Sequence, residues 1–282
     1  MNSALTAITV LVSLLVIFLN GSVYGSVSFL YNDCGTNYQE SGPGPWTALL
    51  HENGAIFCAG TLITKYFILT AANCIKTNAI VKVRLGEYGR KLPSLAEDHL
   101  VQLSLRYRYF NNQSSANDIG LLKLTKEVQF KDYIKPICII SGSNSRPKEF
   151  IGYAWNQLMT DIQANTSIYG TKEFVPIRIE PKRDCKDIDF YSQFCAGNVG
   201  DSLSCDGLSG SALAQNHRFP YQNRYVQFGI ATLSDMDCQE AQGYTSVTDF
   251  YLWIQDVVTL FEHNKYMPKH SYSASATSQR VY

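Results

Sequence analysis

Neither sign of charge is in excess in this sequence of 282 residues, in which 24 lysines and arginines balance 24 aspartates and glutamates. Without a net field to attract a polyanion, we expect neither nucleic acid nor an acidic membrane surface as a partner. Cysteine and histidine form no close cluster with the spacing of a zinc site. We therefore expect no metal site and no cofactor.

Charged side chains make up only 17% of the chain, whereas hydrophobic residues make up 45%. A composition this apolar excludes a disordered chain, because it is sufficient for one sizeable core or two smaller ones.

Basic residues are also missing at the amino terminus, which is atypical of a signal peptide. Otherwise the segment fits one, because Ala4 to Leu19 is almost wholly apolar and small residues follow up to Gly25. This pattern indicates a secretory signal peptide over residues 1–25, and we expect a secreted, extracellular protein with no membrane contact after cleavage. An uncleaved signal anchor is the alternative, although the apolar run is shorter than the roughly 20 residues that span a bilayer.

The eight cysteines are an even number, which fits disulfide bonds in an oxidising compartment. Their spacing alone does not determine the pairing.

From Trp46 onward, short runs with strand periodicity alternate with turns. The runs are 55–63, 66–70, 81–85, 101–105 and 119–124, and after a linker at 126–148 they are 150–155, 174–179, 194–196, 211–214, 225–233 and 243–247. So many short strands predict a closed barrel or a sandwich.

The two ends of the chain differ from this pattern. Residues 26–44 are a short segment rich in glycine and proline, which we expect to be extended and mobile. Ile254, Val258 and Phe261 recur at helical spacing and predict a closing amphipathic helix. Residues 263–282 are polar and rich in small residues, and we expect a disordered tail.

Three segments point to chemistry. Residues 202–213 read SLSCDGLSGSAL and hold Ser209 between two glycines, as expected for a nucleophile with backbone amides beside it. Residues 67–74 read FILTAANC, and residues 116–122 read ANDIGLL. In this order and with these surroundings, the segments resemble the chymotrypsin-like (S1, trypsin-like) serine proteases, which carry there a histidine, an aspartate and a serine.

The resemblance implies an all-β fold of two six-stranded antiparallel β-barrels with a carboxy-terminal α-helix. The domain would span residues 45–262, with the first barrel over about 45–125, the second over about 148–250 and the helix over about 251–262. The resemblance also implies four disulfide bonds, which are Cys34–Cys138, Cys58–Cys74, Cys185–Cys195 and Cys205–Cys238.

Carried over position by position, the resemblance makes Asp118 and Ser209 the remnants of a triad whose histidine position holds Asn73. The backbone amides of Gly207 and Ser209 would form the oxyanion hole. The substrate pocket would be lined by Leu203, Thr232 and Ser234, and Leu203 replaces the aspartate with which trypsin-like enzymes bind Lys or Arg.

The amide of Asn73 is not a base near neutral pH, whereas an imidazole is. Loss of the base alone lowers turnover on the order of 10⁶-fold in a protease with this mechanism. The histidines of the chain lie outside the three motif segments, and they are His51, His99, His217, His263 and His270. We expect none of them to substitute for the missing base.

Two further departures agree with this loss. No Lys or Arg lies between Cys34 and Trp46, so the cleavage site that frees a new amino terminus in active family members is missing. Leu208 stands where those members have the aspartate that pairs with this amino terminus. A carboxylate without its cation would be an unpaired charge in poorly solvated surroundings, so the two absences are consistent with each other.

Asn112 and Asn165 each begin an Asn-x-Ser/Thr triplet in an expected loop. We expect a glycan on at least one of them.

The sequence thus predicts a secreted serine protease homologue without peptidase activity. It resembles the non-catalytic homologues of arthropod extracellular fluids, which implies binding to extracellular proteins, among them proteases or their substrates, as a regulator or cofactor of a proteolytic cascade such as that of innate immunity. An endopeptidase that uses Ser209 with a non-histidine base is the alternative. A structural or adhesive secreted protein is a third possibility.

Overall fold

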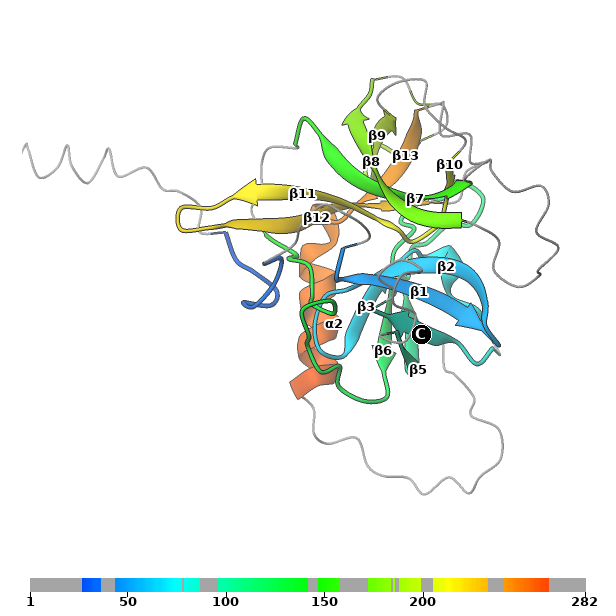
Figure 1. The fold of residues 1–282 in the computed structure, drawn as a ribbon. Helices are drawn as coiled ribbons and strands as arrows, with labels where there is room; N and C mark the ends of the chain where they lie inside the picture. Colours follow the sequence, from blue (N-terminus) through cyan, green and yellow to red (C-terminus); the bar gives the residue numbers. More distant parts are fainter. Residues whose placement is uncertain are drawn as a thin grey trace, which may run out of the picture.

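Six strands close a first barrel in the order β1-β2-β3-β6-β5-β4 (Figure 1). Their bounds are Thr47–Glu52 (β1), Ala55–Leu62 (β2), Phe67–Thr70 (β3), Lys82–Leu85 (β4), Glu97–Arg106 (β5) and Gly120–Leu124 (β6). β1 turns into β2 through Asn53 and Gly54, whose positive φ angles of 51° and 87° suit a two-residue hairpin turn.

This computed structural model describes residues 27–36, 44–77, 79–86, 96–141, 147–157, 172–183, 185, 188–198, 205–232 and 241–263. The expected signal peptide and the expected tail beyond His263 lie outside these ranges.

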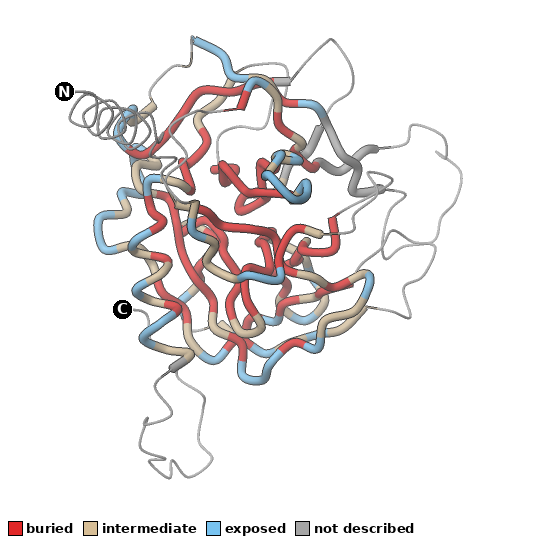
Figure 2. Tube along the Cα trace, turned by 90° about the vertical axis from the view of Figure 1, so that its left-hand side faces the viewer, coloured by how far each residue is buried: buried red, intermediate tan, exposed pale blue. Residues whose placement is uncertain are grey.

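Alternate strand residues fill the first barrel. In β4, Val83 and Leu85 are buried whereas Lys82 is exposed, which is the period of two that the sequence predicts. Phe67 and Leu122 are buried in the same apolar cluster. Figure 2 shows that buried residues lie in the interior of the molecule and that exposed residues lie at its periphery.

The described residues of the second half form seven strands, of which six close into another barrel. Their bounds are Phe150–Gln157 (β7), Lys172–Pro181 (β8), Gln193–Asn198 (β9), Cys205–Gly207 (β10), Ala212–Arg218 (β11), Asn223–Ala231 (β12) and Gln242–Ser246 (β13). Because β7 pairs with both β8 and β11, the ring runs β7-β11-β12-β13-β9-β8, and the short β10 adds to β7. The prediction of two six-stranded barrels is confirmed. β1 and β10 are the two strands that the predicted runs did not include.

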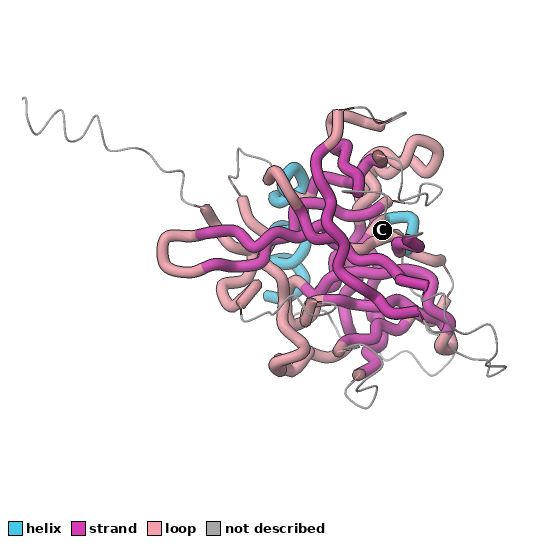
Figure 3. Tube along the Cα trace, turned by 45° about the horizontal axis from the view of Figure 1, so that its top comes forward, coloured by secondary structure: helices cyan, strands magenta, loops and turns pink. Residues whose placement is uncertain are grey.

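A 3₁₀ turn, η3 (Thr248–Phe250), leads from the second barrel into the helix α2 (Tyr251–His263). Ile254 and Val258 are buried in the apolar cluster of the first barrel, so the helix crosses back to the half of the molecule where the domain began (Figure 1). The expected closing helix is confirmed, and strands make up most of the other regular structure in the described residues (Figure 3).

Residues 27–36 correct one expectation. We expected this segment to be mobile, but it is fixed to the rest of the domain. Cys34 is bonded to Cys138, and the backbone N–H of Leu30 donates to the carbonyl of Ile139 over 3.0 Å. A disulfide and backbone pairing hold in place a segment whose own composition favours no regular structure.

Candidate active site

Three segments meet between the two barrels and carry the residues of the motifs. Asn73 lies in the 3₁₀ turn η1 (Ala72–Cys74), shortly after β3. Asp118 lies two residues before β6, and Ser209 lies in the turn between β10 and β11. The side chains of Asp118 and Ser209 are buried, with 0% and 3% exposure.

A chain of hydrogen bonds joins the three side chains. The hydroxyl of Ser209 donates to Oδ1 of Asn73 over 2.9 Å, and Nδ2 of Asn73 donates to Oδ2 of Asp118. The backbone N–H of Asn73 donates to the other carboxylate oxygen over 2.8 Å. An ionised carboxylate only accepts hydrogen bonds, so it faces the amide nitrogen and leaves the amide oxygen for Ser209.

Burial raises the pKa of Asp118 from its ordinary value of 3.8 to about 6, because a charge is poorly solvated there. The hydrogen bonds from Asn73 and the charge of Arg106 act in the opposite direction and favour the carboxylate. The hydroxyl of Thr245 donates to the backbone carbonyl of Asp118 over 3.1 Å. Asp118 is therefore held firmly, but its hydrogen-bond partner is an amide rather than an imidazole.

The turn that carries Ser209 is clamped between strands of both barrels. The N–H of Ala59 in β2 donates to the carbonyl of Ser209, and the N–H of Gly210 donates to the carbonyl of Ala231 in β12, each over 2.8 Å. Gly210 has a φ of +87°, and a Cβ at this position would lie 2.1 Å from the carbonyl oxygen of Ala59. Glycine is required here both for the conformation and for the close approach of β2.

Gly207, one of the two expected oxyanion residues, ends β10 and lies opposite Ala154 of β7. Leu208 follows and is half-buried. The oxyanion role of Gly207 and Ser209 stays a proposal.

Thr232 is the one expected pocket residue that the structure describes. It is buried, and its hydroxyl donates to the carbonyl of Gly243 over 2.9 Å. The hydroxyl of Thr232 is therefore already used in a hydrogen bond within the fold. Leu203 and Ser234 lie outside the described residues.

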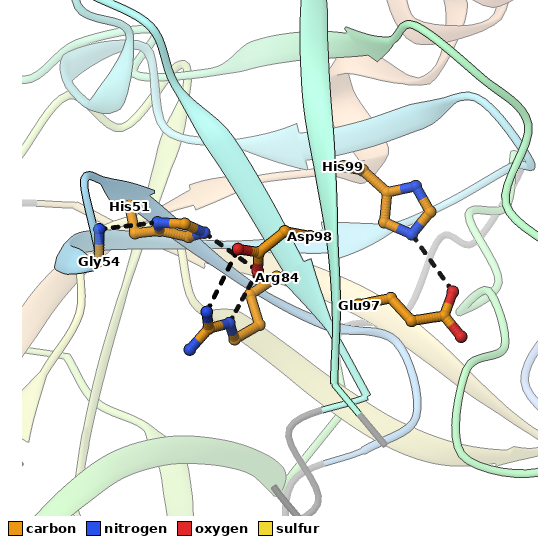
Figure 4. A network of polar contacts seen from close by, with 6 residues as sticks. All are labelled: His51, Gly54, Arg84, Glu97, Asp98 and His99. Atoms are coloured by element: carbon orange, nitrogen blue, oxygen red, sulfur yellow. Dashed lines mark hydrogen bonds and ion pairs between the residues drawn. The ribbon is translucent and has the colours of Figure 1, made fainter. Parts of the chain in front are cut away.

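The described imidazoles have partners elsewhere in the fold. Nε2 of His51 lies 3.2 Å from a carboxylate oxygen of Asp98, and Nε2 of His99 lies 3.7 Å from one of Glu97 (Figure 4). His217 packs on aromatic rings in the β11–β12 hairpin. Among the residues described, no hydrogen bond links an imidazole to Ser209.

Three of the implied disulfides are present, namely Cys34–Cys138, Cys58–Cys74 and Cys185–Cys195. The Cys58–Cys74 bond anchors η1, and with it Asn73, to β2. The fourth pairing rests on Cys238, which lies outside the described residues.

Of the two expected glycosylation sites, Asn112 is exposed in the loop between β5 and β6. Asn165 lies outside the described residues. A carbohydrate at Asn112 would therefore point into solvent.

In the described ranges, no three or more His, Cys, Asp or Glu side chains are grouped so as to hold a metal ion. No helix in these ranges is both long and apolar enough to cross a membrane.

A model of the family named Trypsin matches residues 33–254, which is most of the chain. This chain belongs to the trypsin family. The human protein Kallikrein-4 is 29% identical to it, and the match covers 84% of this chain and 90% of the relative. The Bombyx mori protein "CLIP domain-containing serine protease HP8" is 28% identical over 74% of this chain and 65% of the relative. The Drosophila melanogaster protein "Serine protease grass" is 28% identical to it, and the match covers 76% of this chain and 64% of the relative. The chain thus spans slightly less than two thirds of the two insect relatives.

Sequence reasoning found the three central residues but missed the contacts that hold them. Thr245 and Ala59 belong to none of the motifs that we identified, yet they bond to the backbone of Asp118 and Ser209. Their role depends on strands that are distant in sequence, and no local signal could have found it.

Proposed function

We propose that this protein is secreted and binds other extracellular proteins without cleaving them, as a regulator or cofactor of a proteolytic cascade of innate immunity. The main support for the proposed absence of peptidase activity is the hydrogen bond from the Ser209 hydroxyl to the amide oxygen of Asn73.

A serine hydroxyl attacks a peptide carbonyl only if a base removes its proton during the attack. The oxygen of Asn73 accepts the hydrogen bond, but an amide does not take up the proton near neutral pH. Asp118 is the nearest carboxylate in this chain of bonds, and it contacts Asn73 rather than the serine. Among the described residues, the Ser209 hydroxyl therefore has no hydrogen-bonded acceptor of sufficient basicity.

The sequence around the turn supports the same conclusion. Leu208 replaces the carboxylate that would pair with a freed amino terminus, and no basic residue lies between Cys34 and Trp46 for the cleavage that frees it. Without this ion pair, we expect the backbone around Gly207 to lack the stabilisation that shapes an oxyanion hole.

Binding is the activity that remains to such a scaffold. The barrels hold their loops on rigid strands, and loops on a rigid frame are suited to protein recognition. The relatives are named serine proteases, and we propose that partners include proteases of this kind or their substrates. We propose no nucleic acid, metal or cofactor as a partner.

The retained Ser209 and Asp118 favour a second candidate, an endopeptidase with a non-histidine base. Asp118 has a pKa of about 6, which is in the range of a general base. Its position behind Asn73 opposes this role, because a base needs hydrogen-bond reach to the proton that it removes.

Hydrolysis of a diverse library of fluorogenic peptides separates these two candidates. The purified secreted protein is compared with the Ser209→Ala variant, before and after limited proteolysis. We expect both proteins to show the same background rate in every sample. Turnover that disappears in Ser209→Ala would contradict the proposal and establish the endopeptidase.

A pull-down experiment tests the binding part of the proposal. If binding does not require chemistry at Ser209, a pull-down of extracellular proteins should recover the same partners with Ser209→Ala as with the wild type. Recovery only of proteins that are neither proteases nor their substrates would favour a structural or adhesive role instead.

A further inference from the structure

Two aromatic side chains on the turn before β9 are exposed to solvent. Phe190 is 77% exposed and Tyr191 is 95% exposed. Adjacent exposed aromatic residues are unusual on a monomeric surface and are enriched where proteins bind one another.

The turn that displays these rings is rigid. The carboxylate of Asp189 accepts hydrogen bonds from the N–H of Tyr191 over 3.2 Å and from the hydroxyl of Ser192 over 2.7 Å. The side chain of Gln193 accepts from the N–H of Asp189 over 2.9 Å. A partner would therefore not have to order this segment, which lowers the entropic cost of association.

Hydrogen bonds connect the turn to a third exposed ring. The N–H of Asn117 donates to the hydroxyl of Ser192 over 2.9 Å, and its side-chain amide donates to the carbonyl of Tyr109 over 3.1 Å. Tyr109 is 57% exposed. Phe190, Tyr191 and Tyr109 therefore lie on segments that Asn117 holds together.

The same region continues onto the start of α2. The N–H of Ser246 donates to the carbonyl of Ser192 over 2.9 Å, and α2 begins five residues later. The ring of Tyr107 contacts both that of Tyr109 and that of Trp253 in α2. Leu252, beside Trp253, is 71% exposed. We call Tyr109, Phe190, Tyr191 and Leu252 the aromatic patch.

Charges of both signs border the aromatic patch. The guanidinium of Arg108 lies over the ring of Tyr109 at 4.3 Å from its centre. Asp249 and Asp256 are exposed, three residues before and four residues after Leu252, so they share its side of the helix start. Rings, a cation and carboxylates on one surface are complementary to a second copy of that surface. The whole chain has no formal net charge, so two copies do not repel each other at a distance.

We propose that the aromatic patch is a two-fold interface between two copies of this chain. The three exposed rings offer on the order of 450 Å², about half of the roughly 800 Å² that each side of a standard interface buries. A weak, concentration-dependent dimer is the expected result, in which Arg108 of one copy faces the carboxylates of the other. The inference does not depend on whether Ser209 is catalytic.

Sedimentation velocity of the purified secreted protein from about 1 to 200 μM tests this, since that range brackets micromolar dissociation constants. The double variant Phe190→Ser/Tyr191→Ser should weaken dimerisation at least tenfold. Tyr221→Ser is the matched control, because Tyr221 is 99% exposed at the tip of the β11–β12 hairpin, outside the aromatic patch. It should leave the dimer constant unchanged.

A protein that remains monomeric throughout this range would overturn the proposal. So would a dimer that the double variant leaves intact, or one that Tyr221→Ser weakens equally. The measurement is repeated after enzymatic removal of N-glycans, because Asn112 is exposed near Tyr109. A dimer that forms only in the deglycosylated protein would mean that sugar covers the patch in the secreted form, and it would overturn the proposal as well.

Discussion

Asn73 forms hydrogen bonds with both of its polar neighbours in the candidate site, Asp118 and Ser209. A neutral imidazole and a side-chain amide can each donate a hydrogen bond to one partner and accept one from another. The amide of Asn73 can therefore bridge Asp118 and Ser209 and leave neither buried group unpaired, which would destabilise the fold. An amide is not a base near neutral pH, and the absence of peptidase activity that we propose rests on this property.

The carboxyl of Asp118 should make the stability of the protein depend on pH. Its folded pKa of about 6 lies above the ordinary 3.8, so its contribution is fully present below pH 3.8 and is lost as the pH rises through about 6. The loss is about 3 kcal/mol at 1.36 kcal/mol per pKa unit. Asp118→Asn should therefore lose less stability than the wild type between pH 4 and pH 7, as measured by urea unfolding at each pH.

Asp98 is a control, because its contribution to stability should depend on pH in the opposite direction. The hydrogen bond from Arg84 is the main cause that lowers the pKa of Asp98, so its contribution to stability is present above its unfolded pKa and is lost as the pH falls. Asp98→Asn should remove stability at pH 7 and little at low pH. Parallel curves for the wild type and Asp118→Asn would show that burial does not perturb Asp118.

At the scale of elements, the turn between β10 and β11 depends on its contact with the opposite barrel. The carbonyl of Ser209 accepts from Ala59 of β2, and this contact leaves no room for a side chain at Gly210. The position of Ser209 is therefore set by packing between barrels, whether or not it is used for catalysis.

Gly210→Ala should destabilise the fold through both strain and collision. A non-glycine residue at positive φ costs roughly 1–2 kcal/mol, and the new Cβ would also displace the backbone of β2. Gly54→Ala is the matched control, because Gly54 has the same φ of 87° but lies in the β1–β2 turn. We expect a larger loss in thermal unfolding for Gly210→Ala than for Gly54→Ala. Equal losses would mean that the backbone of β2 moves away from the new Cβ without a measurable cost in stability.

At the scale of the whole molecule, disulfides join parts that are far apart in sequence. Cys34–Cys138 spans 104 residues and fixes the amino-terminal segment, whereas Cys185–Cys195 spans 10 residues within the second half. A crosslink that closes a longer loop restricts the unfolded chain more strongly.

Removal of the two bonds should thus have unequal effects. The loop-entropy relation gives about 2 kcal/mol more destabilisation for Cys34→Ala/Cys138→Ala than for Cys185→Ala/Cys195→Ala. Chemical denaturation of the two double variants measures the difference. The opposite order would show that local packing, rather than loop length, determines what each bond contributes.

The sequence by itself determined the architecture and the identity of the central residues. Alternating residues such as Val83 and Leu85 predicted strands with one buried side, in a barrel or a sandwich. The resemblance of the three motifs to trypsin-like proteases implied the two barrels. The presence of Asn73 where the resemblance expects a histidine is likewise visible in the sequence, because it concerns residue type alone.

Only the tertiary structure decided which atoms these residues contact. The bond from Ser209 to Asn73, the burial that raises the pKa of Asp118 and the fixed position of residues 27–36 all depend on segments separated by tens of residues or more. The aromatic patch likewise combines the turn before β9, the loop before β6 and the start of α2. Local patterns predict which face of an element is apolar. Burial and hydrogen bonding depend on which elements finally pack together, and a single sequence does not show this.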